Sequence, residues 1–160
     1  MSYNFSADEI FEMAKQIEVN GAKFYKEAAE KVQGESEKEF LTTLAHMEEK
    51  HEKTFAKMHE QFKAIVKDKD ESMFDPDGEA VRYLKSLADS KIFFKKDPPG
   101  DTMENILHSA IRAEQDSVIF YLGMCELVSD ELGKNRVDKI IKEELDHIRI
   151  LSQKATEIGI

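Results

Sequence analysis

The sequence has few of the residues that interrupt helices. Its 160 residues include three prolines and seven glycines, and it has no tryptophan. Few helix breakers, together with many Glu, Lys, Ala, Leu, Met and Ile residues, favour helix over sheet along almost the whole chain. The length suits one domain with a full-sized core and is short for two. We therefore predict an all-α protein that forms a single domain over residues 1–160.

Cysteine is also scarce, and the 33 acidic residues outnumber the 23 basic ones. The single Cys125 cannot form an internal disulfide or a thiolate metal cluster, and its apolar surroundings in residues 118–128 indicate a buried thiol in a protein from a reducing compartment. A formal net charge of -10 argues against an electrostatic grip on nucleic acid or anionic lipid and suits the attraction of cations. No run approaches the roughly 18 apolar residues of a membrane span, and no signal sequence is evident. We expect a soluble, cytoplasmic protein that binds no nucleic acid or membrane.

Capping patterns and apolar stripes of helical period predict a first pair of long helices. Ser6 and Glu9 form a capping-box pattern that opens a helix ending at Gly34. A second such pattern over residues 36–39 restarts the chain after a short turn, so the next helix must fold back antiparallel to the first. Hairpin one therefore spans about residues 6–66.

A crossover connection is expected over about residues 67–101. Asp75-Pro76 resembles the start of a short helix, and the residues that this helix would bury are Val81, Leu84, Leu87 and Ala88. The Asp101–Glu104 stretch then opens a third helix, which ends before Gly133, and a fourth helix runs from about Asn135. These two helices form hairpin two, over about residues 102–158.

Polar residues occupy positions that these apolar stripes otherwise reserve for the core. Glu48 and His51 do so in the second helix, and Glu144 and His147 do so in the fourth. Residues three apart in a helix share a face, so each pair can offer one oxygen and one nitrogen to a metal ion. The first and third helices each carry a Glu and a Tyr seven residues apart: Glu18 with Tyr25, and Glu114 with Tyr121.

The two halves of the chain repeat this pattern at one offset. The residue numbers differ by 96 in all four pairs: 18 and 114, 25 and 121, 48 and 144, 51 and 147. A single Glu-x-x-H match is often a chance event, but six such residues on four apolar stripes are not. Burying four carboxylates and two imidazoles without counter-charge would cost far more than the roughly 5–15 kcal/mol by which a fold is stable. Two divalent cations would cancel four carboxylates; a network of buried ion pairs or a vestigial site is the alternative.

The residue types also select the metal. A carboxylate-rich site with nitrogen and without thiolate suits iron or manganese, whereas structural zinc prefers Cys and His. Iron is the first choice, and manganese shares the same ligand set. One Glu from each of two helices with Glu-x-x-His from the other two is typical of ferritin-like di-iron bundles. We predict a ferritin-like four-helix bundle of two duplicated antiparallel hairpins, with a di-iron site between them.

On these residues the chain resembles the rubrerythrin branch of the ferritin-like di-iron carboxylate superfamily, over both hairpins but not over the connection. The resemblance implies that Tyr25 and Tyr121 donate to the ligand carboxylates and that Glu48 and Glu144 bridge the ions. Members of that family reduce hydrogen peroxide, and related proteins oxidise or store iron. The full set of metal ligands that the resemblance implies is Glu18, Glu48, His51, Glu114, Glu144 and His147.

The chain departs from its relatives at three points. Rubrerythrins usually have a further carboxylate one turn after the helix-three ligand, on which their ligand switching depends, and this chain has Ser117 there. Glu49 stands where bacterioferritins have the haem-ligating Met, so no haem is expected. The four-cysteine rubredoxin module is absent from this sequence. Electrons are therefore expected from an external donor, which would be rubredoxin-like or a flavoprotein.

The sequence thus predicts a di-iron oxidoreductase that reduces hydrogen peroxide or dioxygen with electrons from that donor. A ferroxidase or iron-storage protein, with a possible homo-oligomer, is the alternative, and a metal-free helical interaction module is a second. Glu143 either holds the free ring nitrogen of His51 or is a solvated surface residue. The other three histidines are expected to be solvated: His46, His59 and His108.

Overall fold

The computed structural model describes residues 7–67, 79, 82–84, 86 and 98–160. Four long helices dominate this part of the chain, and it contains no strand, which confirms the all-α prediction. A short 3-10 helix, η2, precedes the last long helix. The helices are α1 (Ala7–Lys31), α2 (Glu35–Val66), α4 (Met103–Leu127), η2 (Asp130–Leu132) and α5 (Lys134–Glu157).

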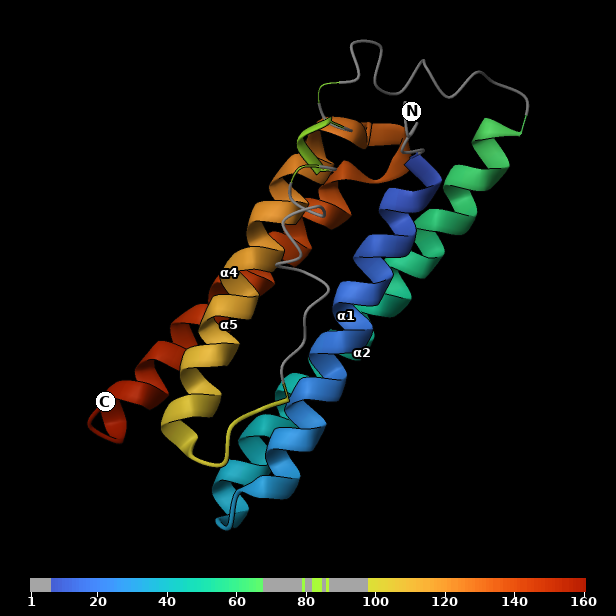
Figure 1. Cartoon of the computed structure of the whole chain (residues 1–160). Helices are drawn as coiled ribbons and strands as arrows, with labels where there is room; N and C mark the ends of the chain where they lie inside the picture. Colours follow the sequence, from blue (N-terminus) through green and yellow to red (C-terminus); the bar gives the residue numbers. More distant parts are fainter. Residues whose placement is uncertain (1–6, 68–78, 80–81, 85, 87–97) are drawn as a thin grey trace.

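The long helices form an elongated bundle of two antiparallel hairpins (Figure 1). Helix α1 packs along α2, and α4 packs along α5. The connection from α1 to α2 is the short turn that the sequence predicts, whereas α4 ends at Leu127, before the predicted end near Gly133, and η2 lies between it and α5. None of the helices in the described ranges combines the length and the apolar character that crossing a membrane requires.

Two helix starts differ from the sequence prediction. Gly34, rather than Ser36, is the N-cap of α2, with an extended backbone and a carbonyl that accepts from Lys38 N at 3.0 Å. No side chain caps this helix, but carboxylates in its first turn face the positive end of the helix dipole. At α4 the cap is Thr102, whose hydroxyl accepts from Asn105 N, rather than Asp101. The predicted Ser6 cap lies outside the described residues.

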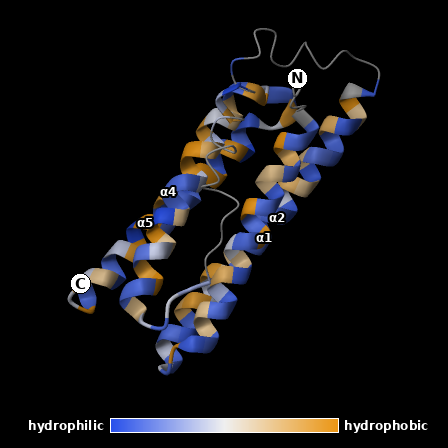
Figure 2. Cartoon of the chain, in the orientation of Figure 1, coloured by the Kyte–Doolittle hydropathy of each residue, from blue (hydrophilic) through white to orange (hydrophobic). Residues whose placement is uncertain are grey.

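The apolar core consists of two clusters, one toward each end of the bundle. Along each long helix the residues of the two clusters are separated by a short polar interval. Every long helix carries both hydrophilic and hydrophobic residues (Figure 2). The polar intervals fall at 18, 48–51, 114 and 144–147, so the fold places the unusual Glu and His residues together between two apolar layers.

The described part of the crossover packs against α4. Glu79, residues 82–84 and Ser86 have helical backbone, in line with the predicted short helix, and Leu84 is fully buried. A Cβ on Gly123 of α4 would lie 2.4 Å from the Tyr83 ring, so glycine permits this close approach. The predicted contacts of Val81, Leu87 and Ala88 lie outside the described residues.

The prediction that His59 is solvated is wrong. Its side chain is fully buried, its ring stacks on Phe11 with centroids 5.4 Å apart, and its Nε2 lies 2.6 Å from Asp8 Oδ1. These partners come from the first turns of α1, and they meet His59 because of the register between α1 and α2. His46 and His108 are exposed, as predicted.

Candidate metal centre

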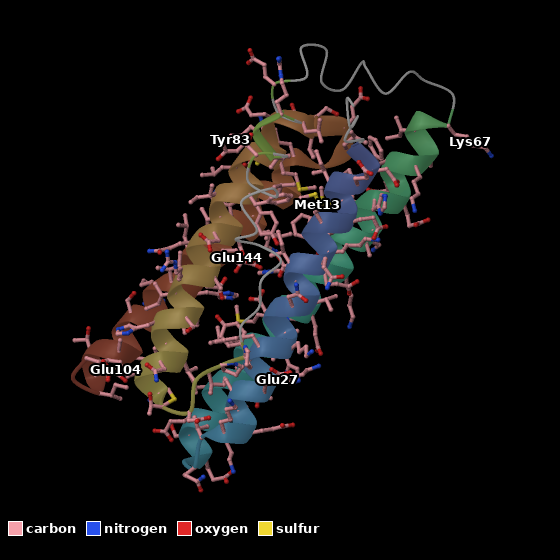
Figure 3. All side chains as sticks on the ribbon, viewed as in Figure 1. Met13, Glu27, Lys67, Tyr83, Glu104 and Glu144 are labelled. Atoms are coloured by element: carbon pink, nitrogen blue, oxygen red, sulfur yellow. The ribbon has the colours of Figure 1, made fainter. Side chains whose placement is uncertain are left out.

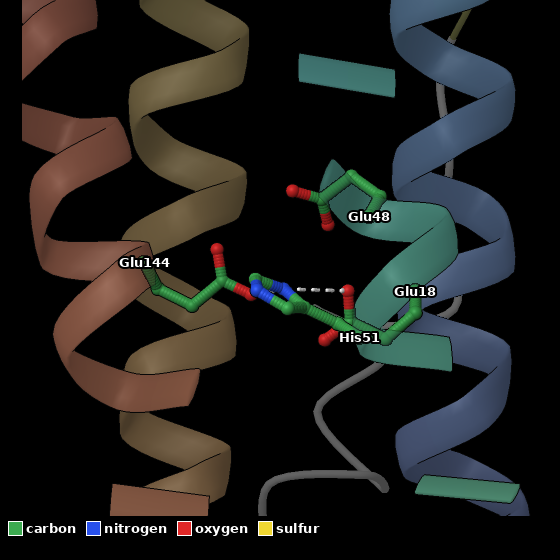
Figure 4. Close-up of side chains that lie close together, drawn as sticks. All are labelled: Glu18, Glu48, His51 and Glu144. Carbon is green, nitrogen blue, oxygen red and sulfur yellow. Dashed lines mark hydrogen bonds and ion pairs between the residues drawn. The ribbon is translucent and has the colours of Figure 1, made fainter. Parts of the chain in front are cut away.

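The six predicted ligand residues meet in the middle of the bundle. Glu144 belongs to α5 and lies about midway along the bundle (Figure 3). Figure 4 shows Glu18 of α1 and Glu48 and His51 of α2 turned toward Glu144 across the space between the hairpins. All six side chains are buried, each with at most 4% of its surface exposed.

The first group of candidate ligands surrounds the His51 ring. It consists of Glu18, Glu48, His51 and Glu144, each of which offers one ligand atom within 4.8 Å of the others. His51 Nδ1 lies 3.0 Å from Glu144 Oε1 and 3.5 Å from Glu18 Oε2. One nitrogen and three carboxylates therefore converge on a single small volume.

A second group repeats the first with the roles of the hairpins exchanged. It consists of Glu48, Glu114, Glu144 and His147. His147 Nδ1 lies 2.9 Å from Glu144 Oε2, 3.2 Å from Glu48 Oε1 and 3.4 Å from Glu114 Oε1. Glu48 and Glu144 belong to both groups, and the two imidazole rings stack with centroids 5.7 Å apart. The duplication seen in the sequence is thus an approximate two-fold symmetry of the site.

Each outer carboxylate receives a hydrogen bond from a tyrosine of the other hairpin. Tyr121 donates to Glu18 Oε1, and Tyr25 donates to Glu114 Oε1. Burial, followed by the nearby carboxylates, raises the pKa of both phenols well above the ordinary value. The two hydroxyls therefore stay protonated at neutral pH and act as fixed donors.

Burial without a metal ion favours the protonated form of the outer carboxylates. The pKa of Glu18 is raised well above its ordinary value of 4.5, first by burial and then by the negative charges of Glu48 and Glu144. The same causes raise the pKa of Glu114. A folded-state pKa above the unfolded value stabilises the metal-free fold below pH 4.5, and this contribution is lost as the pH rises through the folded-state value.

The two imidazoles are held in their charged form. Burial opposes this charge, but contacts with Glu144 and Glu18 outweigh burial and raise the pKa of His51 from 6.5 to about 11. Contacts with Glu114, Glu144 and Glu48 likewise outweigh burial and raise the pKa of His147. Both histidines stabilise the metal-free fold below pH 6.5, and this stabilisation is lost as the pH rises through their folded-state pKa.

The pKa of Glu144 is shifted in the opposite direction. Burial opposes its charge, but contacts with His147 and His51 outweigh burial and lower the pKa from 4.5 to about 2. Glu144 therefore stabilises the fold above pH 4.5 and loses that contribution as the pH falls toward 2.

The donor set fits a pair of divalent cations. Several buried ligand atoms have no hydrogen-bond partner among the described residues: Glu18 Oε2, Glu48 Oε1, Glu144 Oε2, and Nδ1 and Nε2 of His147. His147 Nδ1 is close to Glu144 Oε2 but lacks hydrogen-bond geometry. Buried polar atoms without partners are costly, and most of these face one another. Carboxylate and imidazole ligands without thiolate suit iron or manganese.

Two further residues support the site. Glu143 Oε2 lies 2.6 Å from His51 Nε2, which confirms that Glu143 holds the outer ring nitrogen. Gly21 is a contributor that the sequence showed only as a small residue in an apolar stripe: a Cβ there would lie 2.6 Å from Glu48 Oε2. The absence of a side chain at residue 21 therefore makes room for the shared carboxylate.

Comparison with protein families agrees with this geometry. The family model described as Rubrerythrin matches residues 9–155. The chain belongs to the rubrerythrin family. The matched range includes the connection, over which the sequence alone showed no resemblance. A search of curated proteins found no match, and neither did a search of solved structures.

Ser117 stands where the resemblance to rubrerythrins implies a further carboxylate. The Ser117 hydroxyl donates to the Ala113 carbonyl oxygen at 3.0 Å, so it is directed to its own helix backbone. Glu49 makes an ion pair with Lys26, between α2 and α1. The family and the buried Glu/His cluster support a ferritin-like fold with a candidate metal site.

Proposed function

We propose that this protein is a redox enzyme that binds two iron ions in the Glu/His cluster and reduces hydrogen peroxide, or dioxygen, with electrons from a separate donor. The observation that carries the proposal is that Glu48 and Glu144 belong to both ligand groups. A carboxylate can bridge two ions, and such bridged pairs are typical of ferritin-like bundles. Two bound irons would supply the two electrons that the reduction of peroxide to water requires.

In this proposal the outer ligands divide between the ions. Glu18 and His51 would hold one ion, and Glu114 and His147 would hold the other. The hydrogen bond from Tyr121 fixes Oε1 of Glu18 and leaves Oε2 without a hydrogen-bond partner among the described residues, so Oε2 is available to an ion. The tyrosines therefore orient the outer carboxylates, and their raised pKa keeps the donated protons in place at neutral pH.

The surroundings of the cluster favour a small oxidant. Phe55 packs against the Tyr121 ring, with centroids 5.0 Å apart, on the side of one apolar layer. Both residues are fully buried. Peroxide and dioxygen are small enough for such an enclosed site, whereas a bulky organic substrate is not.

The electrons would come from another protein. The chain has one cysteine, and Cys125 is buried and directed toward Asp138 Oδ1 at 3.4 Å. It therefore cannot itself supply the four thiolates of a rubredoxin-type iron. A rubredoxin-like protein or a flavoprotein is the proposed donor.

The test is multiple turnover by the iron-loaded protein. Reduced protein, loaded anaerobically, should consume many equivalents of hydrogen peroxide when a chemical reductant is supplied in excess. The Glu48→Ala variant should lose this activity, and the exposed His46→Ala variant should keep it. If peroxide oxidises the irons once and no reductant restores the reaction, the proposal fails.

A second candidate function is ferrous iron oxidation for storage, and Ser117 is the observation that favours it. The carboxylate that supports ligand switching in rubrerythrins is absent at this position, and the Ser117 hydroxyl bonds to its own helix instead. Storage requires a closed shell of many subunits and much more than two irons per chain. Native mass measurement after aerobic iron addition separates the two functions, because a monomer or dimer with two irons excludes storage.

A further inference from the structure

The outer nitrogens of the two clustered histidines have different surroundings. Both rings turn Nδ1 toward the shared carboxylates, so Nε2 points away from the cluster in each case. His51 Nε2 lies 2.6 Å from Glu143 Oε2, a residue of the other hairpin. His147 Nε2 is buried and has no hydrogen-bond partner in the described part of the chain. The approximate symmetry of the site is broken at this point.

The sequence explains why. Glu143 stands four residues before His147, and the duplicated position, 96 residues earlier, is Met47, four residues before His51. Because Glu143 of α5 reaches His51 of α2, the repeat directs residue 47 of α2 toward His147. A methionine sulfur is a weak acceptor. Within the described ranges, an outer carboxylate therefore contacts one imidazole, and none contacts the other.

This difference affects metal binding through the imidazole. When Nδ1 binds an ion, the neutral ring carries its hydrogen on Nε2. At His51 this N–H donates to a carboxylate, which orients the ring and makes it a stronger ligand. At His147 the same N–H would be a buried donor with no acceptor in the part of the chain that the structure describes. Removal of such an outer partner typically lowers metal affinity by roughly 10–100-fold.

We infer that the two metal positions are unequal, and that the position of Glu18 and His51 fills first, with an affinity roughly 10–100-fold higher than that of Glu114 and His147. The inference rests on the proposed two-ion centre. Two other contacts are closely matched between the positions. His51 Nδ1 lies 3.0 Å from the shared carboxylate of the opposite hairpin, Glu144, and 3.5 Å from the outer carboxylate, and the corresponding distances for His147 Nδ1 are 3.2 and 3.4 Å. His147 Nδ1 also lies 2.9 Å from Glu144 of its own helix, but this contact leaves its Nε2 without a partner among the described residues. Glu143 is thus a positioning residue that distinguishes the ions.

Two single-position variants test the order. Glu114→Gln keeps the complete Glu18 and His51 position, and Glu18→Gln keeps the other. The variants are matched because each alters one outer carboxylate that accepts from a tyrosine. Calorimetric titration of the metal-free full chain with Mn²⁺ should show tighter binding by Glu114→Gln, by roughly 10–100-fold. Equal affinities, or the reverse order, overturn the inference.

Exchanging the outer residues tests the cause. In the Glu18→Gln background, Met47→Glu should strengthen Mn²⁺ binding, while Met47→Leu, which adds no acceptor, should leave it unchanged. In the Glu114→Gln background, Glu143→Met should weaken binding, and Glu143→Gln should weaken it less. Circular dichroism verifies helix content. Where Met47→Glu fails to fold, Met47→Gln offers an acceptor oxygen without charge. Affinities that do not respond to any folded variant overturn the inference.

The unmodified protein separates this inference from the proposed function. Binding of two ions with unequal affinities supports both the inference and the proposed two-ion centre. Two ions bound with equal affinity overturn the inference and leave the two-ion centre standing. A folded protein that binds fewer than two ions overturns both.

Discussion

Gly21→Ala should impair the metal centre without unfolding the protein. Gly21 lies within α1, opposite the shared carboxylate of Glu48. An added Cβ would lie 2.6 Å from Glu48 Oε2 and 3.2 Å from its Cδ and Cγ, whereas ordinary contacts begin at 3.4 Å. The carboxylate must therefore retreat by about 0.8 Å. Metal sites tolerate deviations of only about 0.2 Å in ligand distance, so this shift is large.

The expected result is weaker binding of both ions, because Glu48 belongs to both ligand groups. We expect the affinity for each ion to fall by at least roughly tenfold, since a misplaced ligand loses much of its bond to the metal. In the metal-free protein, the higher helix propensity of alanine, about 1 kcal/mol, offsets much of the crowding. The thermal midpoint of the metal-free variant should therefore change little.

The assay is Mn²⁺ titration with thermal unfolding of the same samples. Gly123→Ala is the matched control, because it adds the same methyl group in a helix but crowds Tyr83 and Leu84, which belong to neither ligand group. Unchanged affinity in Gly21→Ala, a loss confined to one ion, or an equal loss in the control would refute the reasoning.

Three further outcomes are expected. Up to four protons should be released when two ions bind, because four cluster groups have a raised pKa in the metal-free protein. A pH-stat titration should detect these protons, and the metal affinity should rise with pH. Tyr121→Phe should lower the affinity only for the ion held by Glu18, by roughly tenfold, because one charge-assisted hydrogen bond is lost. An equal loss of affinity for both ions would contradict the assigned pairing. His59→Ala should lower the free energy of unfolding by about 2–3 kcal/mol in urea titration, through the lost ring packing, while metal stoichiometry stays unchanged.

The fold and the ligand set were predictable because the duplication makes each half a test of the other. Glu48 and His51 alone form a weak motif. Because Glu144 and His147 repeat it at a constant offset, the two motifs together predict a duplicated site. The structure brings all of these residues together. The sequence offers the pairing of Glu143 with His51 as one of two options, because a metal-bound imidazole commonly needs an outer partner.

The features that the sequence missed depend on the register between helices. His59 is buried because Phe11 and Asp8 of α1 lie opposite it, and no stripe in α2 alone contains that information. The capping-box pattern predicts a start of α2 at Ser36, whereas the helix begins after Gly34 without a side-chain cap. The role of Gly21 likewise depends on how closely α1 approaches Glu48.

The most direct test of the central claim is the iron content of the folded protein after anaerobic loading with Fe²⁺ and removal of unbound metal. The proposed centre predicts two irons per chain, and a loss of iron binding in the Glu48→Ala and Glu144→Ala variants with their helix content retained. A folded protein that binds no iron, or variants that bind as much as the unmodified chain, would contradict the claim.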